Sequence, residues 1–387
     1  MEEFFLDSVA WEASYDLNSD ITLYILHHGA LFRICYVARK LASLPSALEQ
    51  HHESYKILYR QNLDEKILVA ERLRKPFEEL MNRLAPTIST ESIRSLHSYL
   101  YPPSFILDAT IKESHIEPCF RTTVSRWKFV CSGEYVDNND CFQPHLPSLA
   151  SKVDVYSSRR IQVLAHTTQL VPSKVSVDGV TYFFKPWLSG RGHGYHELRS
   201  HDKILVASEA NPSSLCNAYI CRLHGLIIDD DDDVLQHYQL HTYPEDSDED
   251  SDEDDSDTEN CDEDKSHGTR LVGLLLTYIE NRGTMHYVAP WPDCTNEERT
   301  RWSRQIRESV QTLHAAGVVW GDAKTDNVLI GKDGNAYLID FGGSYTQGWV
   351  DKDKMETVEG DLQGLKRIEE WLVHWSENPI TFTQAEK

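Results

Sequence analysis

Acidic, basic and amide side chains flank a predicted hairpin in the last quarter of the chain. Its two apolar runs, VLI and YLI, enclose a Gly-Lys-Asp-Gly turn, and Asp-Gly between such runs favours a β-hairpin. Asp322, Lys324 and Asn327 precede the first run, and Asp340 follows the second. The hairpin would therefore bring two carboxylates, an ammonium and an amide to one edge. Such a set can hold a divalent metal through oxygen ligands and neutralise a phosphate with the lysine.

The spacing of these residues resembles that of the protein kinases. Residues 322–327, Asp-x-Lys-x-x-Asn, are similar to the kinase catalytic loop, and residues 340–342, Asp-Phe-Gly, are similar to the metal-binding motif that follows it. The pair of strands between the motifs also matches. Asp-Phe-Gly alone would favour an ordinary acidic hairpin in some other fold, but the two motifs in register favour a kinase-like site.

The resemblance implies a role for each side chain. Asp322 would orient the acceptor hydroxyl and take its proton, and Lys324 would stabilise the transferring phosphoryl group. Asn327 and Asp340 would hold Mg²⁺, with ATP as the phosphoryl donor. Trp-Gly-Asp stands here in place of the usual His-Arg-Asp, and Gly321 is similar to the glycine of kinase-like phosphotransferases that act on small molecules.

The elements that must position these residues begin with three β-rich runs. They cover 161–165, 174–177 and 180–185. Asp178-Gly179 favours a tight turn between the last two. In a kinase-like small lobe the third strand ends on Lys185, which the resemblance implies would hold the α- and β-phosphates of ATP. Residues 166–172, between the first two runs, contain no glycine. This departs from the family and weakens the expected approach of backbone N–H groups to phosphate.

A helix is expected after the glycine-rich loop 190–194. Glu197 lies where the kinase C-helix glutamate would pair with Lys185 and bind the nucleotide indirectly, and Glu209 is the alternative. A positioned carboxylate would hold an otherwise mobile lysine in place.

Two further strands are expected over 219–228 and 270–279. If the family resemblance holds, Leu276 would close the back of a nucleotide pocket. Thr277 and Ile279 would then belong to the hinge that offers backbone groups to adenine.

A capping box, Thr295-x-x-Glu298, predicts the start of a long helix, and Gly317 predicts its end. An apolar stripe on this helix comprises Trp302, Ile306, Val310 and Leu313. Asp361 resembles the kinase F-helix aspartate that braces the catalytic loop. Only 26 residues follow Asp361, so we expect a shortened helical lobe.

Composition is typical of a globular protein, with 387 residues, 40% of them hydrophobic, which allows two or three domains. No apolar run approaches the ~18 residues of a membrane span, and the acidic start lacks the basic stretch of a secretory signal. The eight cysteines form no Cys-x-x-Cys pair, which disfavours zinc and disulfide frameworks. We therefore expect an intracellular protein, cytoplasmic or nuclear.

The net charge of −24 is local. Residues 229–233 supply five negative charges and residues 245–264 supply fourteen more, and without these nineteen the chain would carry −5. The remainder has no basic excess for nucleic acid. Residues 243–266 are expected to form a disordered acidic insert, which is either a solvated loop or a binding segment for a basic partner.

Residues 1–150 are expected to form a mostly helical N-terminal region, because apolar residues between 57 and 80 recur at helical spacing. A linker is expected near 143–155. The predicted fold class is α+β: a two-lobed protein kinase-like fold with an antiparallel β N-lobe over 155–280 and a truncated helical C-lobe over 281–387. The motifs WGDAK, IDFGG and ETVEGDLQGL resemble a divergent group of kinase-like proteins from filamentous fungi.

Three functions follow from the resemblance. The first is a serine/threonine kinase-like enzyme that transfers the γ-phosphoryl group of Mg-ATP to a hydroxyl. The second is a small-molecule kinase of the aminoglycoside or choline kinase-like type, favoured by Gly321 and the short segment after Asp340. The third is a nucleotide-binding pseudokinase scaffold, favoured by the glycine-free loop.

Overall fold

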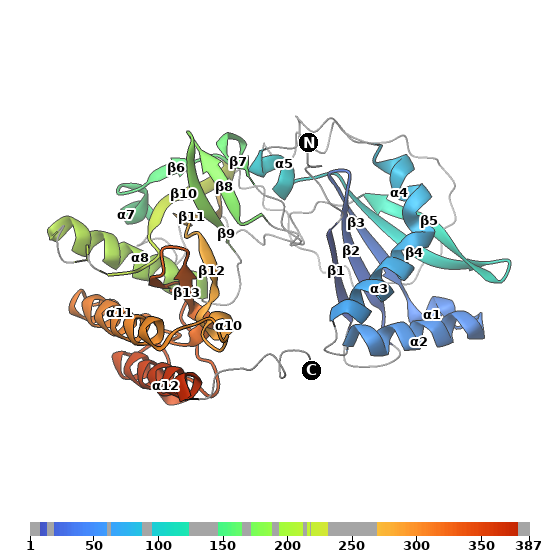
Figure 1. The fold of residues 1–387 in the computed structure, drawn as a ribbon. Coiled ribbons are helices and arrows are strands. Elements are labelled where there is room, and N and C mark those ends of the chain that lie inside the picture. Colours follow the sequence, from blue (N-terminus) through green and yellow to red (C-terminus); the bar gives the residue numbers. More distant parts are fainter. Residues whose placement is uncertain are drawn as a thin grey trace. The chain divides into compact units, whose positions relative to one another are not determined.

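The structure, a computed structural model, describes residues 8–13, 19–59, 63–86, 95–123, 146–164, 172–187, 193–211, 215–216, 218–230 and 269–377. The chain divides into two compact units. The first unit comprises Met1–Tyr135, Ser157–Val175 and Ile228–Arg270, and the second comprises Val136–Tyr156, Ser176–Ile227 and Leu271–Lys387. Figure 1 labels the elements of both units.

The first unit contains a five-stranded sheet with the strand order β1-β2-β3-β4-β5. The strands are β1 (Ser8–Ala13), β2 (Ile21–His27), β3 (Ala30–Tyr36), β4 (Ser104–Lys112) and β5 (His115–Thr123). β3 and β4 pair in parallel, whereas the other neighbours are antiparallel. A parallel pair requires a long crossover, and helices occupy it. They are α1 (Ala38–Leu41), α2 (Pro45–Tyr59), α3 (Leu63–Arg74), the 3₁₀ turn η1 (Lys75–Phe77), α4 (Glu78–Leu84) and α5 (Leu96–Leu100).

The prediction of a mostly helical N-terminal region is therefore wrong, although helices do occupy most of the expected span 57–80. In β2 and β3, six of seven residues are buried. Strands that are buried on both faces have continuous apolar runs instead of the alternation that identifies a strand. The described part of the linker expected near 143–155 contains α7 (Leu146–Ala150) and the start of β6 (Asp154–Tyr156).

A second sheet has six strands in the order β6-β10-β11-β9-β8-β7. Its other strands are β7 (Gln162–Val163), β8 (Lys174–Val177), β9 (Val180–Pro186), β10 (Leu223–Asp230) and β11 (Thr269–Thr277). The 3₁₀ turn η2 (Ser158–Arg160) precedes β7, and helix α8 (His193–Ala210) follows β9. Two of the three β-rich runs predicted after residue 159 are confirmed as β8 and β9, whereas the described part of the first run, predicted over 161–165, contains only the two-residue strand β7. Asp178 and Gly179 form the predicted turn, with φ of +50° and +83°, which a tight hairpin turn requires.

The predicted hairpin is also confirmed and belongs to a three-stranded sheet. Its strands are β12 (Asn281–Thr284), β13 (Val328–Gly331) and β14 (Ala336–Leu338), in that order. The helices around it are α10 (Met285–Val288), α11 (Asn296–Ala315), α12 (Val358–Glu377) and the short turns η3 (Thr325–Asn327) and η4 (Lys352–Lys354). The capping box at Thr295 and Glu298 starts α11, and Gly317, with φ of +70°, follows its end.

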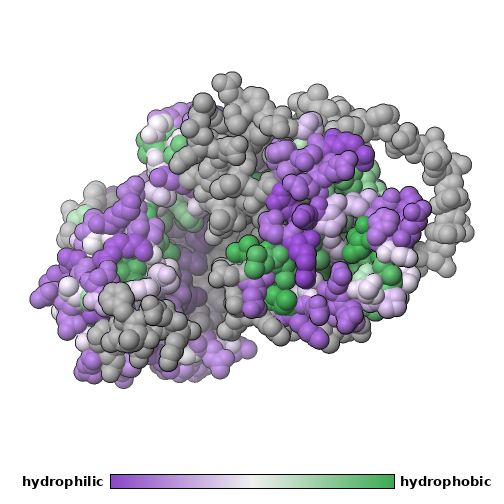
Figure 2. All heavy atoms as spheres, turned by 45° about the vertical axis from the view of Figure 1, so that its right-hand side comes forward, coloured by the Kyte–Doolittle hydropathy of each residue, from purple (hydrophilic) through white to green (hydrophobic). Residues whose placement is uncertain are grey.

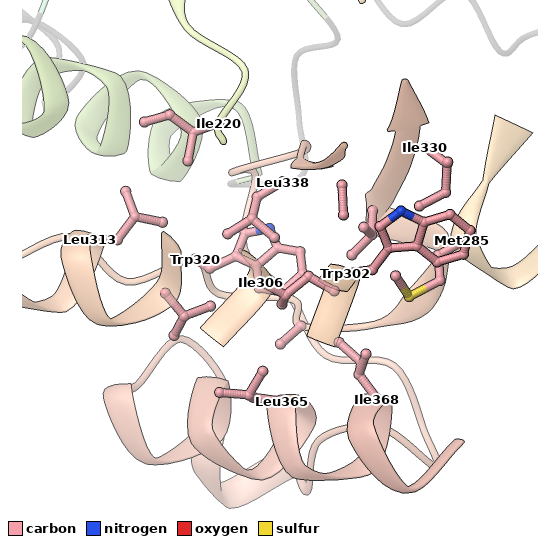
Figure 3. Packing of buried hydrophobic residues seen from close by; sticks show 14 of the residues in the cluster. Ile220, Met285, Trp302, Ile306, Leu313, Trp320, Ile330, Leu338, Leu365 and Ile368 are labelled. Carbon is pink, nitrogen blue, oxygen red and sulfur yellow. The ribbon is translucent and has the colours of Figure 1, made fainter. Parts of the chain in front are cut away.

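The core that supports the hairpin lies around two buried tryptophans (Figure 3). Trp302 of α11 and Trp320 are both 0% exposed, and Leu365 and Ile368 of α12 pack into the same cluster. The Trp302 indole donates a hydrogen bond to the Gly334 carbonyl, 2.9 Å away. The helices thus hold both the turn of the hairpin and the residues that precede it.

None of the helices in the described ranges is long and apolar enough to cross a membrane. On the face drawn in Figure 2, most of the coloured surface is hydrophilic, and hydrophobic residues form smaller patches. The acidic insert expected at 243–266 lies outside the described residues.

Candidate active site

Lys185 lies at the centre of a cluster of charged side chains. The Lys185 ammonium on β9 lies 2.8 Å from both carboxylate oxygens of Glu197 on α8, and 2.8 Å from Oδ1 of Asp340 after β14. Glu197 is only 4% exposed. The structure therefore contains the ion pair predicted for Lys185 and Glu197, whereas the alternative partner, Glu209, is exposed near the end of α8.

The charges of this cluster depend on one another. Burial lowers the pKa of Lys185, but the Glu197 and Asp340 carboxylates outweigh this effect and raise the pKa above its ordinary value. Burial raises the pKa of Asp340, but attraction to Lys185 outweighs it and leaves the pKa below the usual range. Lys185 and Asp340 are therefore both charged at neutral pH.

The Asp322 carboxylate lies in a second group of polar side chains, contributed by residues around the hairpin. Lys324 donates to Asp322 Oδ2 at 2.5 Å. The Asn327 side-chain amide donates to the Asp322 carbonyl oxygen at 2.9 Å and to its Oδ2 at 3.1 Å. The backbone carbonyl of Asn327 accepts from the N–H of Ile339 at 3.0 Å. The hairpin thus places Asn327 beside the residue that precedes Asp340, as its sequence predicts.

Thr346 is a site residue that the sequence did not reveal. Its hydroxyl donates to Asp322 Oδ1 at 3.0 Å and accepts from the Lys324 ammonium at 2.9 Å. The chain reaches it through a turn in which Gly343 and Ser344 have φ of +75° and +91°. No spacing rule in the sequence anticipates this irregular path.

Asp361 braces the segment that precedes Asp322. Its carboxylate accepts hydrogen bonds from the backbone N–H groups of Trp320 at 2.7 Å and Gly321 at 2.8 Å. The His314 imidazole lies 2.8 Å from the same carboxylate. Asp361 is 1% exposed, so these bonds are shielded from water.

Gly321 has a conformational reason to be glycine. Its φ is +96°, and a Cβ atom at this position would lie 3.0 Å from the Gly343 Cα and 3.0 Å from the His196 ring. A side chain would therefore be both strained and crowded. Gly321 therefore has a structural role here, and the small-molecule substrate that it favours by resemblance stays a prediction.

Two histidines of α8 contact the Asp-Phe-Gly segment. His196 Nδ1 lies 2.8 Å from the Phe341 carbonyl oxygen. The His201 ring packs edge-on against the Phe341 ring, with 5.5 Å between their centroids. Through these contacts α8 positions the segment that carries Asp340.

His201 offers a test by stability. It is 1% exposed, and neither ring nitrogen has a hydrogen-bond partner among the described residues. An unsatisfied buried polar group costs about 1–3 kcal/mol, so we expect H201L to raise the Tm. As a control, H196L removes the contact with the Phe341 carbonyl and should lower the Tm. Thermal unfolding of the three proteins checks both expectations.

The pH dependence of the same variant adds a second readout. Burial, with a smaller contribution from Lys185, lowers the pKa of His201 to about 3, below the unfolded value of about 6.5. The unfolded chain therefore binds this proton first, and wild-type stability should fall as pH drops from about 6.5 toward 3. H201L should lose stability less steeply in this window. Parallel profiles for the two proteins would contradict the assignment.

The two predicted hinge residues, Thr277 and Ile279, form hydrogen bonds within the fold. The Thr277 N–H donates to the Arg222 carbonyl at 2.9 Å, and the Thr277 hydroxyl accepts from the Arg222 N–H at 3.1 Å. The Ile279 carbonyl accepts from the Asn281 side chain at 2.9 Å. The Thr277 N–H and the Ile279 carbonyl thus already form hydrogen bonds within the protein.

The predicted metal ligands, Asn327 and Asp340, offer oxygen atoms, the ligand type that a hard divalent cation prefers. Because the Asn327 amide nitrogen donates to Asp322, its side-chain oxygen points elsewhere. Asp340 is 48% exposed at its side chain. An amide oxygen and an accessible carboxylate are ligands that Mg²⁺ accepts, usually with water and phosphate oxygens. Within the described ranges, no three His, Cys, Asp or Glu side chains gather into a metal site by themselves.

Comparison with known proteins agrees with this geometry. Residues 263–363 match the family model of the protein kinase domain. A KEOPS complex subunit Bud32 from Pyrococcus abyssi is 31% identical over 102 residues, which is 26% of this chain and 42% of that protein. The human hormonally up-regulated neu tumor-associated kinase is 41% identical over 75 residues, 19% of this chain and 10% of that protein. The serine/threonine-protein kinase PKH3 of Eremothecium gossypii is 39% identical over 54 residues, 13% of this chain and 7% of that protein.

The matched segment contains Asp322, Lys324, Asn327, Asp340 and Asp361. The chain spans about a tenth of the length of the first curated relatives that it matches. These similarities support a protein kinase-like family, and an α+β architecture agrees with it.

Proposed function

We propose that the protein is a phosphotransferase of the serine/threonine kinase type, which transfers the γ-phosphoryl group of Mg-ATP to a hydroxyl. One observation carries the proposal: Asp322 lies against both Lys324 and Thr346, while the Lys185–Glu197 pair meets Asp340. Phosphoryl transfer depends mainly on positioning and charge compensation, and these two groups can supply both.

Each side chain of the site would have a separate role in phosphoryl transfer. Asp322 would orient the acceptor hydroxyl and take its proton as the oxygen bonds to the γ-phosphorus, while ADP leaves with the electrons of the broken P–O bond. Lys324 would stabilise the charge on the transferring group, and Lys185, held by Glu197, would hold the α- and β-phosphates. Asn327 and Asp340 would hold Mg²⁺, which when bound neutralises phosphate charge.

The proposed organisation is an N-lobe over about 155–280 and a shortened C-lobe over 281–387. Three further expectations also stay predictions: the resemblance to fungal kinase-like proteins, the intracellular location and a basic partner for the insert at 243–266.

A pseudokinase scaffold is the second candidate. It is favoured by the glycine-free segment 166–172, most of which lies outside the described residues.

A Mg-ATP binding and turnover assay on the full chain tests the proposal. We expect calorimetry to show ATP binding that strengthens when Mg²⁺ is added, and coupled detection of ADP to show turnover with a panel of protein and small-molecule hydroxyl substrates. Binding without turnover on any substrate would favour the scaffold. Equal ATP binding with and without Mg²⁺ would contradict the metal role of Asn327 and Asp340.

Thr346 provides a sharper test of the site. T346V removes the hydroxyl that contacts both Asp322 and Lys324 and keeps the shape of the side chain. We therefore expect turnover to fall by up to about 100-fold, the effect of misplacing a catalytic group by about 1 Å. T346S keeps the hydroxyl and should retain most activity. Equal turnover for the two variants would show that the hydroxyl does not position Asp322.

A further inference from the structure

A groove beside α10 takes no part in the proposed reaction. It has a volume of about 370 Å³. Its walls are Arg282, Tyr287, Val288, Trp291, Pro292 and Asp293. The groove is within the size range of binding sites for small molecules and short peptide segments.

Two aromatic rings form the exposed wall of the groove. Tyr287 is 65% exposed and Trp291 is 36% exposed. Their ring centroids lie 6.1 Å apart, with the planes tilted by 53°. Val288 at the base is only 5% exposed. Large aromatic side chains held side by side at the surface supply contact area at little cost in conformational entropy.

The charge at the rim of the groove is negative. The Arg282 guanidinium donates to Glu298 Oε1 at 2.9 Å, and the Thr295 N–H fixes the other oxygen of Glu298 at 2.9 Å. Arg282 is therefore compensated within the fold. The Asp293 side chain lies 3.9 Å from Arg282 and is 78% exposed, so its carboxylate remains accessible to a cation from solution.

We propose that this groove binds an extended, proline-containing peptide segment of a partner protein, with an arginine or lysine next to the proline. Aromatic-lined grooves bind proline-rich segments in the polyproline II conformation, because such segments are already ordered before binding. Tyr287 and Trp291 would pack against the proline ring, and Asp293 would pair with the neighbouring cation.

Fluorescence anisotropy with the full chain, without nucleotide, tests this site. The probe is a fluorescein-labelled peptide with the sequence Gly-Ala-Pro-Arg-Pro-Ala-Pro-Ala-Gly. Two matched peptides replace its arginine by glutamate or its prolines by alanine. We expect the probe to bind with a Kd of about 10–100 μM, typical of a small docking contact, and both matched peptides to bind at least about tenfold more weakly.

Substitutions in the groove test whether the probe binds there. Y287A and W291A should each weaken probe binding by about tenfold. D293K should lower the affinity for the arginine peptide and raise the affinity for the glutamate peptide. The controls are F120A, an exposed aromatic of β5, and D353K, an exposed carboxylate of η4. Neither control should change the affinity. Because Tyr287 and Asp293 are largely exposed, we expect Y287A and D293K to fold. These two variants test whether the peptide binds in the groove even if W291A does not fold.

Three results would overturn the proposal. They are no binding of the probe up to about 1 mM, equal binding of all three peptides, and equal loss in the groove variants and the controls. Sedimentation that shows a dimer dissociated by Y287A would assign the groove to a second copy of the chain instead. ATP turnover of D293K, measured separately, should equal that of wild type, so failure here is distinguishable from failure of the proposed phosphotransferase activity.

Discussion

D322N is expected to abolish phosphoryl transfer and to leave ATP affinity nearly unchanged. Asparagine has nearly the same shape, but it cannot take the proton of the acceptor hydroxyl. Thr346 and Lys324 donate to different oxygens of Asp322, so the single side-chain oxygen of asparagine can keep one of these two hydrogen bonds. Loss of a general base lowers turnover by about 10²–10⁴-fold. ADP release measures turnover, and calorimetry measures ATP binding.

D326N is the matched control for this experiment. Asp326 lies in the same loop, its side chain is 51% exposed, and it faces His286 at 3.8 Å instead of the charged cluster. We expect D326N to keep wild-type turnover. If D322N and D326N lost activity equally, or if D322N retained it, Asp322 would not be the base.

D361A is expected to destabilise the second unit strongly and to remove activity. The substitution leaves the backbone N–H groups of Trp320 and Gly321 buried without an acceptor, and each unsatisfied group costs about 1–3 kcal/mol. We therefore expect a loss of about 2–6 kcal/mol in the free energy of unfolding. Urea denaturation followed by circular dichroism measures this loss.

Glu359 supplies the control for D361A. It is an acidic residue of the same first turn of α12, with a side chain that is 73% exposed. E359A should change the free energy of unfolding by less than about 1 kcal/mol, as for other exposed ion pairs. A similar loss of unfolding free energy for E359A and D361A would mean that the negative charge at the start of the helix stabilises the protein, and not the hydrogen bonds from Asp361 to the backbone.

The parts of the fold that the sequence predicts are those with local signals. The capping box at Thr295, the Asp178-Gly179 turn and the hairpin at 328–338 each follow from residues close together in the chain. The pair of Lys185 and Glu197, which the kinase resemblance implied, joins the end of a strand to the next helix, 12 residues along the chain. Such short-range patterns leave few alternative conformations.

The sequence could not predict features set by distant contacts. Strands β2 and β3 of the first unit are buried at six of seven positions each, so they carry no alternation. Asp229 belongs to an acidic run in the sequence, but it is 3% exposed and accepts from the N–H of Ser158 at 2.9 Å. Thr346 lies 24 positions after Asp322 and reaches it through the irregular segment that follows the hairpin. In each case the partner is unknown until the chain is folded.

The buried indole of Trp320 has an optical consequence. Its ring nitrogen donates to the carbonyl of Ile339 at 2.9 Å, and Ile339 directly precedes Asp340. Tryptophan emission responds to the polarity and hydrogen bonding around the ring, so any rearrangement of the segment that carries Asp340 would change the emission of Trp320. The chain has nine tryptophans, and the difference between wild-type and W320F spectra would isolate this one. The protein thus carries an intrinsic fluorophore one residue away from its candidate metal ligand.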